Sequence, residues 1–345
     1  MNHEEIRQVL ANPCYEDTPP PSPKPGSDPL IETHISFVIM GNTFVYKLKK
    51  TIRVSFLDFS TLEKRKFYCF QELNLNRRLA HDMYLDVLPV VRTPENQLCI
   101  GQQQGEIIDY ALKMKRMDSS KEMHRLLEQQ VVEERHIRAL ADKIIPFHQQ
   151  AEVIHLDFSI DQYRERFNRI VDIKPVVQQH LGQQYDQVID RSVRWSDRFL
   201  NNHAGVIEQR HHNGLVRDCH GDLHSKNIFL YEEPVIFDCI EFNTDFRYSD
   251  VLNDIAYLCM DLDMWGRPDL SELFYSIYSR EFSGQPEPDA DTLRLYNYYK
   301  CFRANVRAKV NAMNAEELEN GPQKQEHLVE LKKYLELMTR YMDRP

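Results

Sequence analysis

Hydrophobic residues near the start of the chain fall into short runs rich in β-branched and aromatic side chains. The runs IETHISFVIM and TFVYKLKK flank Gly41 and Asn42, a pattern typical of a β-hairpin. Three further strands are predicted at residues 87–92, 98–102 and 107–117.

The segment 60–80 has a different period. Its apolar residues recur at roughly helical spacing, and Ser60 or Thr61 is a suitable N-cap. Residues 30–117 are therefore predicted to form a small sheet with one long helix.

Residues 1–29 precede this sheet. Residues 2–12 are compatible with a short helix. The run PPPSPKPGSDP at 19–29 is not, because proline removes backbone donors and fixes φ, and it predicts an extended arm.

Helical patterns dominate from residue 118 onward, so 118–345 is predicted as a second, mainly helical lobe. A β-rich island at 215–239 interrupts it. The fold class expected is α+β with two lobes. The predicted helices are 122–129, 132–150, 160–170, 176–202, 249–263, 270–282, 291–315 and 325–342.

Charge and composition narrow the choice of partners. The chain of 345 residues has a formal net charge of -10 and no basic stripe, which argues against a nucleic-acid partner. An acidic surface would suit a cationic substrate, or it confers solubility only. No apolar run reaches the roughly 20 residues of a membrane span, and the first residues do not have the layout of a signal peptide.

The cysteines are scattered, odd in number and never in a CxxC pair. This pattern predicts reduced thiols in a cytoplasmic protein, with neither a disulfide framework nor a zinc site. The seven residues are Cys14, Cys69, Cys99, Cys219, Cys239, Cys259 and Cys301.

The strongest chemical signal lies in the β-rich island. Residues 220–227 read HGDLHSKN, and two short apolar strands with a turn between them lead from there to Asp238. This predicted hairpin gathers Asp222, Asn227 and Asp238 at its mouth. Phosphoryl transfer needs such a set: a carboxylate that orients a hydroxyl and accepts its proton, here Asp222, and oxygen ligands for Mg²⁺, here Asn227 and Asp238. The alternative is a buried turn that uses Asp and Asn only as hydrogen-bonding residues.

The spacing of Asp222 and Asn227 matches the H-R-D-x-x-x-x-N loop of protein kinases. The HGDxxxxN loop followed by IFD resembles the aminoglycoside phosphotransferase-like kinases, a group that includes antibiotic, choline and fructosamine kinases. The stretch VIFDCIEFNTDFRYSDVLNDIAYLCMDLD is similar to a branch described as aminoglycoside phosphotransferase family enzymes. That branch is often fused to a C-terminal P-loop domain. No GxxxxGK[ST] occurs here, so we expect this chain to lack it.

The resemblance covers residues 30–315 and implies a protein-kinase-like fold with ATP and Mg²⁺ as cofactors. Such a site needs a strand lysine on the phosphates and a helix glutamate that orients it. Lys47, in FVYK, is the preferred lysine; Lys49 shares its face of the strand. Glu72 is the preferred partner, with Glu63 as the alternative. A solvated strand edge would also explain either lysine.

A protein-kinase glycine loop is missing, since no GxGxxG is present. The tip at Gly41 and Asn42 offers the nearest backbone donors for phosphate. Adenine is expected where the lobes meet, around Met114, Arg116 and Met117.

Several residues near the loop have supporting or alternative roles. His220 is expected to brace the loop, and His224 is either a structural histidine or a substrate contact. Asp250 and Asp254 lie four residues apart and face one way. The resemblance implies that one of them buttresses the loop; a helix-start acid fits Asp250.

The acceptor predicted is a hydroxyl of a small molecule, such as an amino sugar, sugar or amino alcohol. Glu241 and Asp245 would suit a cationic acceptor or the metal. Lys300, Arg303 and Arg307 share one helix face, which would suit an anionic acceptor or form a solvated stripe.

Two alternative functions remain. In the first the kinase phosphorylates a protein, and in the second the protein binds a nucleotide without catalysing a reaction. A protein acceptor is disfavoured because no A-P-E motif occurs and Asp238 is not followed by Phe-Gly. A regulatory nucleotide-binding protein without turnover is disfavoured by the intact acidic set. GTP is an alternative to ATP as donor.

Overall fold

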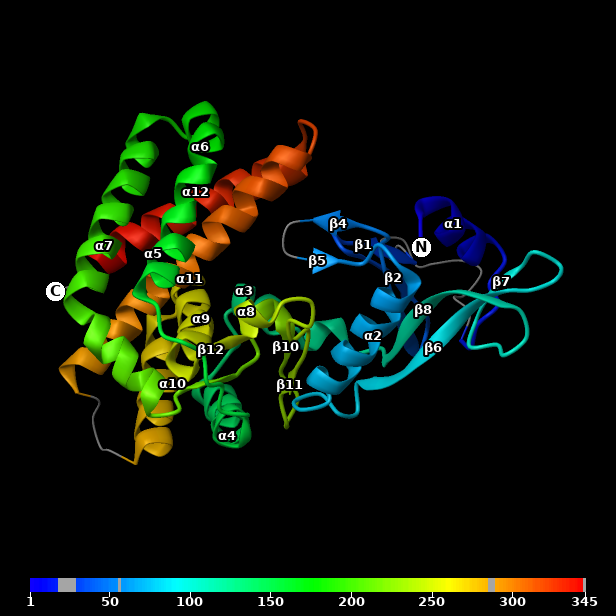
Figure 1. The fold of residues 1–345 in the computed structure, drawn as a ribbon, viewed down its shortest axis with the longest axis horizontal. Helices are drawn as coiled ribbons and strands as arrows, with labels where there is room; N and C mark the ends of the chain where they lie inside the picture. Colours follow the sequence, from blue (N-terminus) through cyan, green and yellow to red (C-terminus); the bar gives the residue numbers. More distant parts are fainter. Residues whose placement is uncertain (18–28, 55–56, 285–288, 344–345) are drawn as a thin grey trace. The chain divides into compact units, whose positions relative to one another are not determined.

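An antiparallel sheet of six strands, in the order β1-β2-β3-β8-β6-β7, holds the first part of the chain together (Figure 1). Met40 lies opposite Val45 in the β2–β3 pair, which confirms the predicted hairpin. The first predicted run proved to be two strands, because Thr33 N–H donates to the Ser36 carbonyl and turns the chain between them. The strands are β1 (Leu30–Glu32), β2 (Ser36–Met40), β3 (Phe44–Lys49), β6 (Tyr84–Arg92), β7 (Leu98–Ile100) and β8 (Glu106–Lys115), with a separate short pair β4 (Arg53–Val54) and β5 (Leu57–Asp58).

This computed structural model describes residues 1–17, 29–54, 57–284 and 289–343. The chain divides into unit 1, residues 1–125 and 227–246, and unit 2, residues 126–226 and 247–345. The boundary at residue 117 stays a prediction; unit 1 continues to Arg125. The hairpin β10 (Ile228–Phe229) and β11 (Val235–Ile236) also belongs to unit 1, because Leu230 N–H donates to the Lys121 carbonyl.

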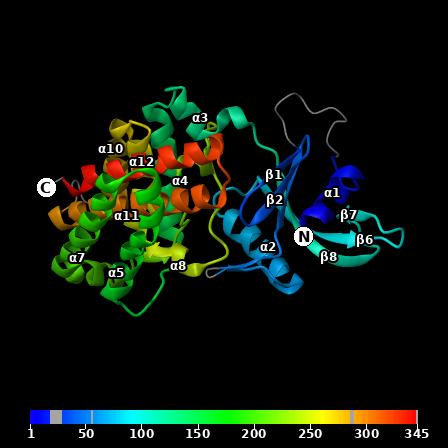
Figure 2. The same cartoon turned by 90° about the horizontal axis from the view of Figure 1, so that it is seen from above.

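Two helices cover opposite faces of the unit 1 sheet (Figure 2). Helix α1 (His3–Ala11) starts with a capping box at Asn2 and buries Ile6 and Val9 against one face. Helix α2 (Leu62–Asn76) is capped by Thr61 and buries Cys69 and Leu73 against the other. Both confirm the predicted helices, although α2 ends before residue 80. Residues 19–28 of the predicted proline-rich arm lie outside the described residues.

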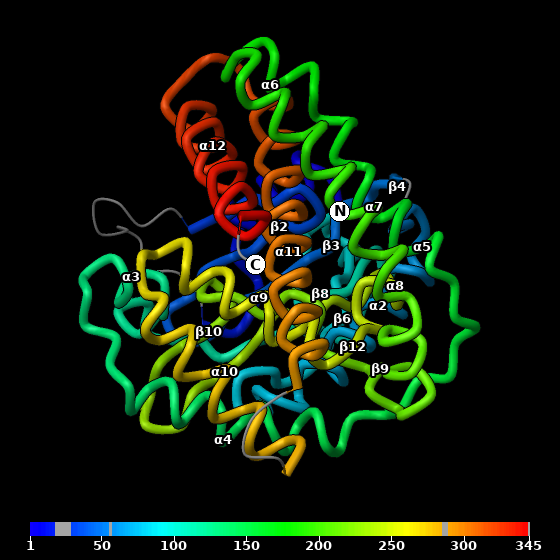
Figure 3. The backbone as a smooth tube through the Cα atoms, turned by 90° about the vertical axis from the view of Figure 1, so that its left-hand side faces the viewer, coloured from blue at the N-terminus to red at the C-terminus, as the bar shows by residue number. Residues whose placement is uncertain are grey.

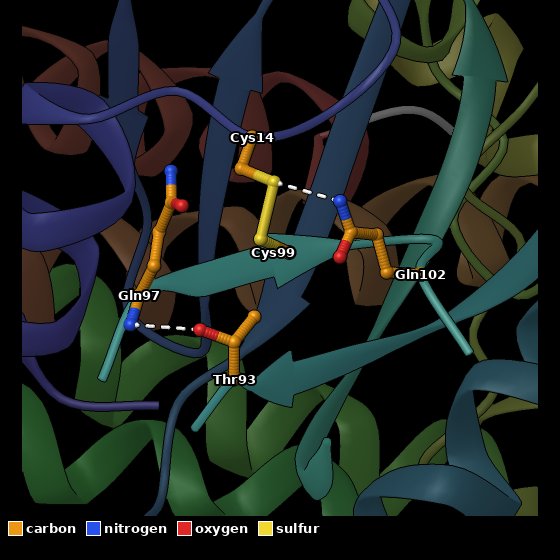
Figure 4. The surroundings of a disulfide bond; sticks show 5 residues. All are labelled: Cys14, Thr93, Gln97, Cys99 and Gln102. Atoms are coloured by element: carbon orange, nitrogen blue, oxygen red, sulfur yellow. Dashed lines mark hydrogen bonds between the residues drawn. A yellow bond between two sulfur atoms is a disulfide. The ribbon is translucent and has the colours of Figure 1, made fainter. Parts of the chain in front are cut away.

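A disulfide bond joins Cys14 to Cys99 in β7, across a sequence separation of 85 residues (Figure 4). Gln102 Nε2 lies 3.2 Å from the Cys14 sulfur. The prediction that every thiol is reduced is wrong, because folding brings a residue after α1 beside a strand that is remote in sequence. The other five cysteines are buried and form no disulfide bond.

Unit 2 is built mainly from helices, of which α7, α11 and α12 are the longest (Figure 3). One helix was predicted over 176–202. Two are present instead, because Gly182 adopts a φ of +90° between them and ends the first. The helices are α3 (Met123–Glu128, in part), α4 (Glu134–Gln150), α5 (Ile160–Asn168), α6 (Lys174–His180), α7 (Gln183–His212), α9 (Val251–Met264), α10 (Pro268–Ser283), α11 (Ala290–Glu317) and α12 (Pro322–Met342).

Short strands frame the segment that carries the HGDLHSKN motif. Strand β9 (Val216–Asp218) pairs with β12 (Tyr248–Asp250), and the motif follows β9 directly. Helix α9 then starts from Asp250, whose carboxylate accepts Leu252 N–H at 2.8 Å. In the described part of the chain, no helix is both long and apolar enough to cross a membrane.

Candidate active site

Asp254 of α9 forms hydrogen bonds with the backbone of the HGD loop, residues 220–222 of unit 2. Its two carboxylate oxygens accept the backbone N–H of Gly221 at 2.8 Å and of His220 at 3.2 Å. Gly221 adopts a φ of +85°, a region that favours glycine. The implied buttress role therefore belongs to Asp254. Asp250 instead caps α9 and pairs with Arg210 at 2.6 Å.

His148 of α4 in turn orients Asp254. Its Nδ1 lies 2.7 Å from the Tyr278 hydroxyl and its Nε2 lies 3.1 Å from Asp254 Oδ2. An ionised carboxylate can only accept, so Nε2–H donates to Asp254 and a neutral ring leaves Nδ1 to accept from the Tyr278 hydroxyl. Burial raises the pKa of Asp254, but the bond from His148 and nearby positive charge outweigh it and lower the pKa to about 2.

Arg303 of α11 supports the same loop from another side. It is buried, and its Nη1 donates to the Gly221 carbonyl at 3.1 Å. Its Nε donates to Asn253 Oδ1 at 3.0 Å, and the guanidinium lies 4.7 Å from the centre of the Tyr257 ring. Arg303 is thus buried and engaged with the loop, which leaves little of its side chain for the substrate contact predicted for it.

The prediction of a solvated stripe on α11 is also wrong, because two of its three side chains are buried. Lys300 is also buried, and its Nζ pairs with Asp263 at 2.5 Å. Only Arg307 keeps a partly exposed side chain, at 16%, with Nε 3.4 Å from the Tyr334 hydroxyl.

Asp222 projects from this braced loop with 31% of its side chain exposed. Its Oδ2 lies 3.2 Å from His224 Nε2. His224 Nδ1 accepts the backbone N–H of Lys226 at 3.2 Å, so a neutral ring carries its proton on Nε2 and donates to Asp222. Burial raises the pKa of Asp222, but His224 and then Arg307 outweigh it and hold the pKa well below its usual range. Asp222 is therefore an ionised hydrogen-bond acceptor.

In unit 1, a buried glutamate of α2 receives two lysines of β3. Lys47 Nζ lies 2.7 Å from Glu72 Oε1, and Lys49 Nζ lies 2.8 Å from Oε2. The lysines share a face because side chains alternate along a strand. Burial alone would raise the pKa of Glu72, but the two lysines lower it, so the carboxylate is charged. The predicted Lys47–Glu72 contact is present.

Asp238 is brought to the same cluster. Its Oδ1 lies 2.7 Å from Lys47 Nζ, and 43% of its side chain is exposed. Asp238 adopts a φ of +61°, which is uncommon for a residue other than glycine. Its backbone N–H donates to the Tyr84 hydroxyl at 3.2 Å, and the next N–H, of Cys239, donates to Asn76 Oδ1 at 2.9 Å. These bonds fix an unusual turn.

The β10–β11 hairpin places Asn227 and Asp238 at one end. Ile228 pairs with Ile236, and Phe237 N–H donates to the Asn227 carbonyl at 3.0 Å. Asn227 therefore lies opposite the residue before Asp238. An amide oxygen and a partly exposed carboxylate at one end of a hairpin are a donor set that suits Mg²⁺.

The comparisons with known proteins bear on the fold of the chain. No protein-family model matches the chain. An amicoumacin kinase, solved with AMP-PNP and Ca²⁺, is 15% identical with a TM-score of 0.53, covering 98% of this chain and 94% of its own. A choline kinase from Cryptosporidium parvum is 11% identical with a TM-score of 0.52, covering 91% and 89%. The chain has a protein-kinase-like fold. It is α+β, with an antiparallel sheet in its N-terminal lobe and helices in its C-terminal lobe.

The curated proteins related in sequence are longer than the part that matches this chain. Uncharacterized proteins of Mycobacterium bovis and Mycobacterium tuberculosis are 28% identical over 287 residues, which is 82% of this chain and 54% of theirs. The chain thus spans about half the length of the curated relatives it matches.

Glu241 does not occupy the substrate or metal position expected for it. It is buried and forms an ion pair with Lys49. Burial raises its pKa, although Lys49 opposes the shift. Asp245, on α8 (Thr244–Arg247), is exposed and stays a candidate substrate residue.

Backbone donors at the β2–β3 tip are already engaged. Gly41 N–H, one of the two predicted phosphate donors, donates to the Phe44 carbonyl at 2.9 Å, and Thr43 and Phe44 donate their N–H groups to Asp17 Oδ2. The prediction that this tip offers donors to phosphate is therefore wrong for Gly41. Sequence alone gave no sign of the contacts of Asp17, because this residue follows a segment with no recognisable motif.

The predicted adenine segment lies at the end of β8. Met114 is buried in the core beneath α2, and Met117 packs against the same cluster. Arg116 N–H donates to the Thr43 carbonyl at 2.7 Å, and its Nη1 reaches the Gly41 carbonyl at 2.5 Å. The adenine contact stays a prediction.

Sequence reasoning missed the residues that support Ser225 in the kinase-like loop. Asp261 Oδ2 accepts Ser225 N–H at 2.8 Å, and Trp265 Nε1 donates to the Ser225 hydroxyl at 3.2 Å. Both are on α9 or directly after it. A helix acid seven residues beyond Asp254 lies on the same face, which is the one signal that could have identified Asp261.

Proposed function

We propose that the protein is an ATP- and Mg²⁺-dependent kinase that transfers the γ-phosphate to a hydroxyl group of a small molecule. The observation that carries the proposal is the contact of Lys47 with both Glu72 and Asp238, at 2.7 Å each. A buried glutamate that orients a lysine beside an aspartate at a hairpin end is the phosphate and metal arrangement of kinases.

In this proposal each residue has the binding role that its chemistry suits. Lys47 would hold the nucleotide phosphates, and Asn227 and Asp238 would bind Mg²⁺, which when bound neutralises phosphate charge. Met114, Arg116 and Met117 would border the adenine.

Asp222 would accept the proton of the attacking hydroxyl. Its depressed pKa makes it a weak base, so its main contribution is to orient the hydroxyl by a hydrogen bond. That suffices for a loose transition state in which catalysis rests on positioning and charge stabilisation. His224, which donates to Asp222 Oδ2, fixes the direction of the Asp222 carboxylate.

The acceptor belongs to the amino sugar, sugar or amino alcohol class in this proposal. Asp245 and Arg307 are candidate contacts of opposite charge. Arg307 is the stronger candidate because it acts electrostatically on Asp222 and retains exposed surface.

The test measures ADP release from Mg-ATP with panels of aminoglycosides, sugars, amino alcohols and nucleosides. Acceptor-stimulated ADP release that disappears in Asp222→Asn supports the kinase. Binding of Mg-ATP without turnover on any acceptor supports a regulatory nucleotide-binding protein instead, and no binding of Mg-ATP contradicts both.

A further inference from the structure

A second ion pair lies behind Lys47 in unit 1. Lys49 Nζ contacts Glu72 Oε2 at 2.8 Å and forms an ion pair with Glu241. Glu72 thus accepts one lysine on each carboxylate oxygen. The usual lysine–glutamate pair of a kinase needs only one of these contacts, so the second lysine calls for a separate explanation.

Burial separates the five charged groups into an outer and an inner set. Lys47 and Asp238 form the outer pair, with 13% and 43% of their side chains exposed. Lys49, Glu72 and Glu241 form the inner set, each with 4% or less exposed. A ligand can reach the outer pair, whereas the inner set is surrounded by protein.

The inner set is also tied to the segment that follows Asp238. Gln71, next to Glu72 on α2, donates from Nε2 to the backbone carbonyl of Glu241 at 2.8 Å. The side chain of Glu241 reaches β3 through Lys49. Helix α2, strand β3 and the turn after Asp238 are therefore joined at one point.

We propose that Lys49 and Glu241 are positioning residues that keep Glu72 and the turn after Asp238 in place while Lys47 and Asp238 give up their mutual ion pair for nucleotide phosphate and Mg²⁺. The inference rests on the proposed function. Neither residue touches the ligand; they act through Glu72 and through the backbone at Glu241.

The physical reason is competition for Lys47. Nucleotide phosphates and Glu72 both attract this ammonium group. With Lys49 present, half of the Glu72 carboxylate is already compensated, so Glu72 can keep orienting Lys47 while the ammonium group exchanges Asp238 for phosphate. Without Lys49, the uncompensated Glu72 would draw Lys47 inward and oppose that exchange.

The test uses the double variant Lys49→Met/Glu241→Gln. It removes both charges together and keeps side-chain volume, so no new unpaired charge is created within the pair. A matched control is Arg65→Met/Asp109→Asn. This second buried pair also joins α2 to the sheet, with Arg65 Nε 2.8 Å from Asp109 Oδ1, and it has no contact with Glu72 among those described. Asp109 also pairs with the N-terminal ammonium of Met1, so the control, like the test variant, takes one charged partner from a third buried group.

Binding of Mg-AMP-PNP is measured by titration calorimetry well below the unfolding temperature of each variant, together with the Mg²⁺ concentration at half-saturation. We expect the dissociation constant of Lys49→Met/Glu241→Gln to rise about tenfold, as for loss of one well-oriented charge contact, and its Mg²⁺ requirement to increase. The control should change less than twofold.

Wild-type affinity in Lys49→Met/Glu241→Gln, or equal weakening in both double variants, would overturn the positioning role while the kinase proposal stands. Wild-type protein that binds no Mg-AMP-PNP would overturn the kinase proposal and this inference together. The two failures are distinguishable because one is seen in the variants and the other in the unmodified chain.

Discussion

The carboxylate of Asp254 accepts the backbone N–H of Gly221 at 2.8 Å. This bond joins helix α9 to the loop that presents Asp222. Asp254→Asn replaces one acceptor oxygen by a donor, which must face either an N–H group or the Nε2–H of His148. We expect acceptor-dependent turnover to fall about 100-fold, because a shift of roughly 1 Å in a catalytic group has that effect.

Steady-state ADP release checks this expectation, with Asp250→Asn as the matched control on the same helix. Asp250 caps α9 and pairs with Arg210, so its variant should lose stability and retain most of its turnover. Equal loss of turnover in both variants would mean that α9 as a whole, and not the loop contact, controls activity.

The buried Asp254 also predicts a pH dependence of stability. Its pKa is lowered from 3.8 to about 2 in the folded protein. A lowered folded pKa stabilises the fold above the unfolded pKa, and the contribution is lost as pH falls from about 4 toward 2, with a magnitude of about 2 kcal/mol.

Urea unfolding of wild type and Asp254→Asn, compared from neutral pH down to the acid limit of folding, measures this contribution. The difference in free energy of unfolding should be constant above about pH 5 and shrink below pH 4. A difference that grows on acidification would contradict the assignment of a charged Asp254.

The two lysines on Glu72 should differ in their effect on stability. Lys47→Met leaves Glu72 paired with Lys49, and its other partner, Asp238, is partly exposed. We expect a loss of about 1 kcal/mol, the scale of one partly exposed charged contact. Lys49→Met leaves two buried carboxylates with one lysine, and we expect about 3–5 kcal/mol.

Chemical unfolding gives the stabilities, and calorimetry with Mg-AMP-PNP gives the second readout. Lys47→Met should abolish measurable nucleotide binding although it is the milder variant for stability. The reverse order of stabilities would show that the burial of Lys49 and Glu241 has little energetic consequence.

The Cys14–Cys99 disulfide should stabilise unit 1. It closes a loop of 85 residues, and a cross-link of this size contributes about 2–4 kcal/mol, mainly by restricting the unfolded chain. Cys14→Ser/Cys99→Ser, or reduction by dithiothreitol, should lower the unfolding midpoint of the protein.

Thiol titration under denaturing conditions should count five free cysteines before reduction and seven after it. Dithiothreitol should leave the midpoint of the double serine variant unchanged. Seven free thiols in protein purified without reductant would contradict the disulfide.

Local patterns predicted much of this protein. The strand pair around Gly41, helix α2 behind Thr61 and most helices of unit 2 follow from spacing and caps within a few residues. The one helix predicted over 176–202 failed at Gly182, whose positive φ is a local event that periodicity does not report.

The HGDLHSKN loop and the hairpin after it were predictable because a tight hairpin sets its own register. Pairing of Ile228 with Ile236 requires Asn227 and Asp238 to lie at one end. The sequence by itself thus determined which acids and amides meet there, since the connection is short and covalent.

Only the tertiary structure decided which charged groups are buried and what they contact. Lys49 and Glu241 are 192 residues apart, Arg303 and Gly221 are 82 apart, and Cys14 and Cys99 are 85 apart. Glutamate and arginine are residue types suited to binding a substrate. Folding nevertheless buries Glu241 and Arg303 against the groups that they support. Burial and long-range pairing depend on how remote elements pack, and no periodicity within one element carries that information.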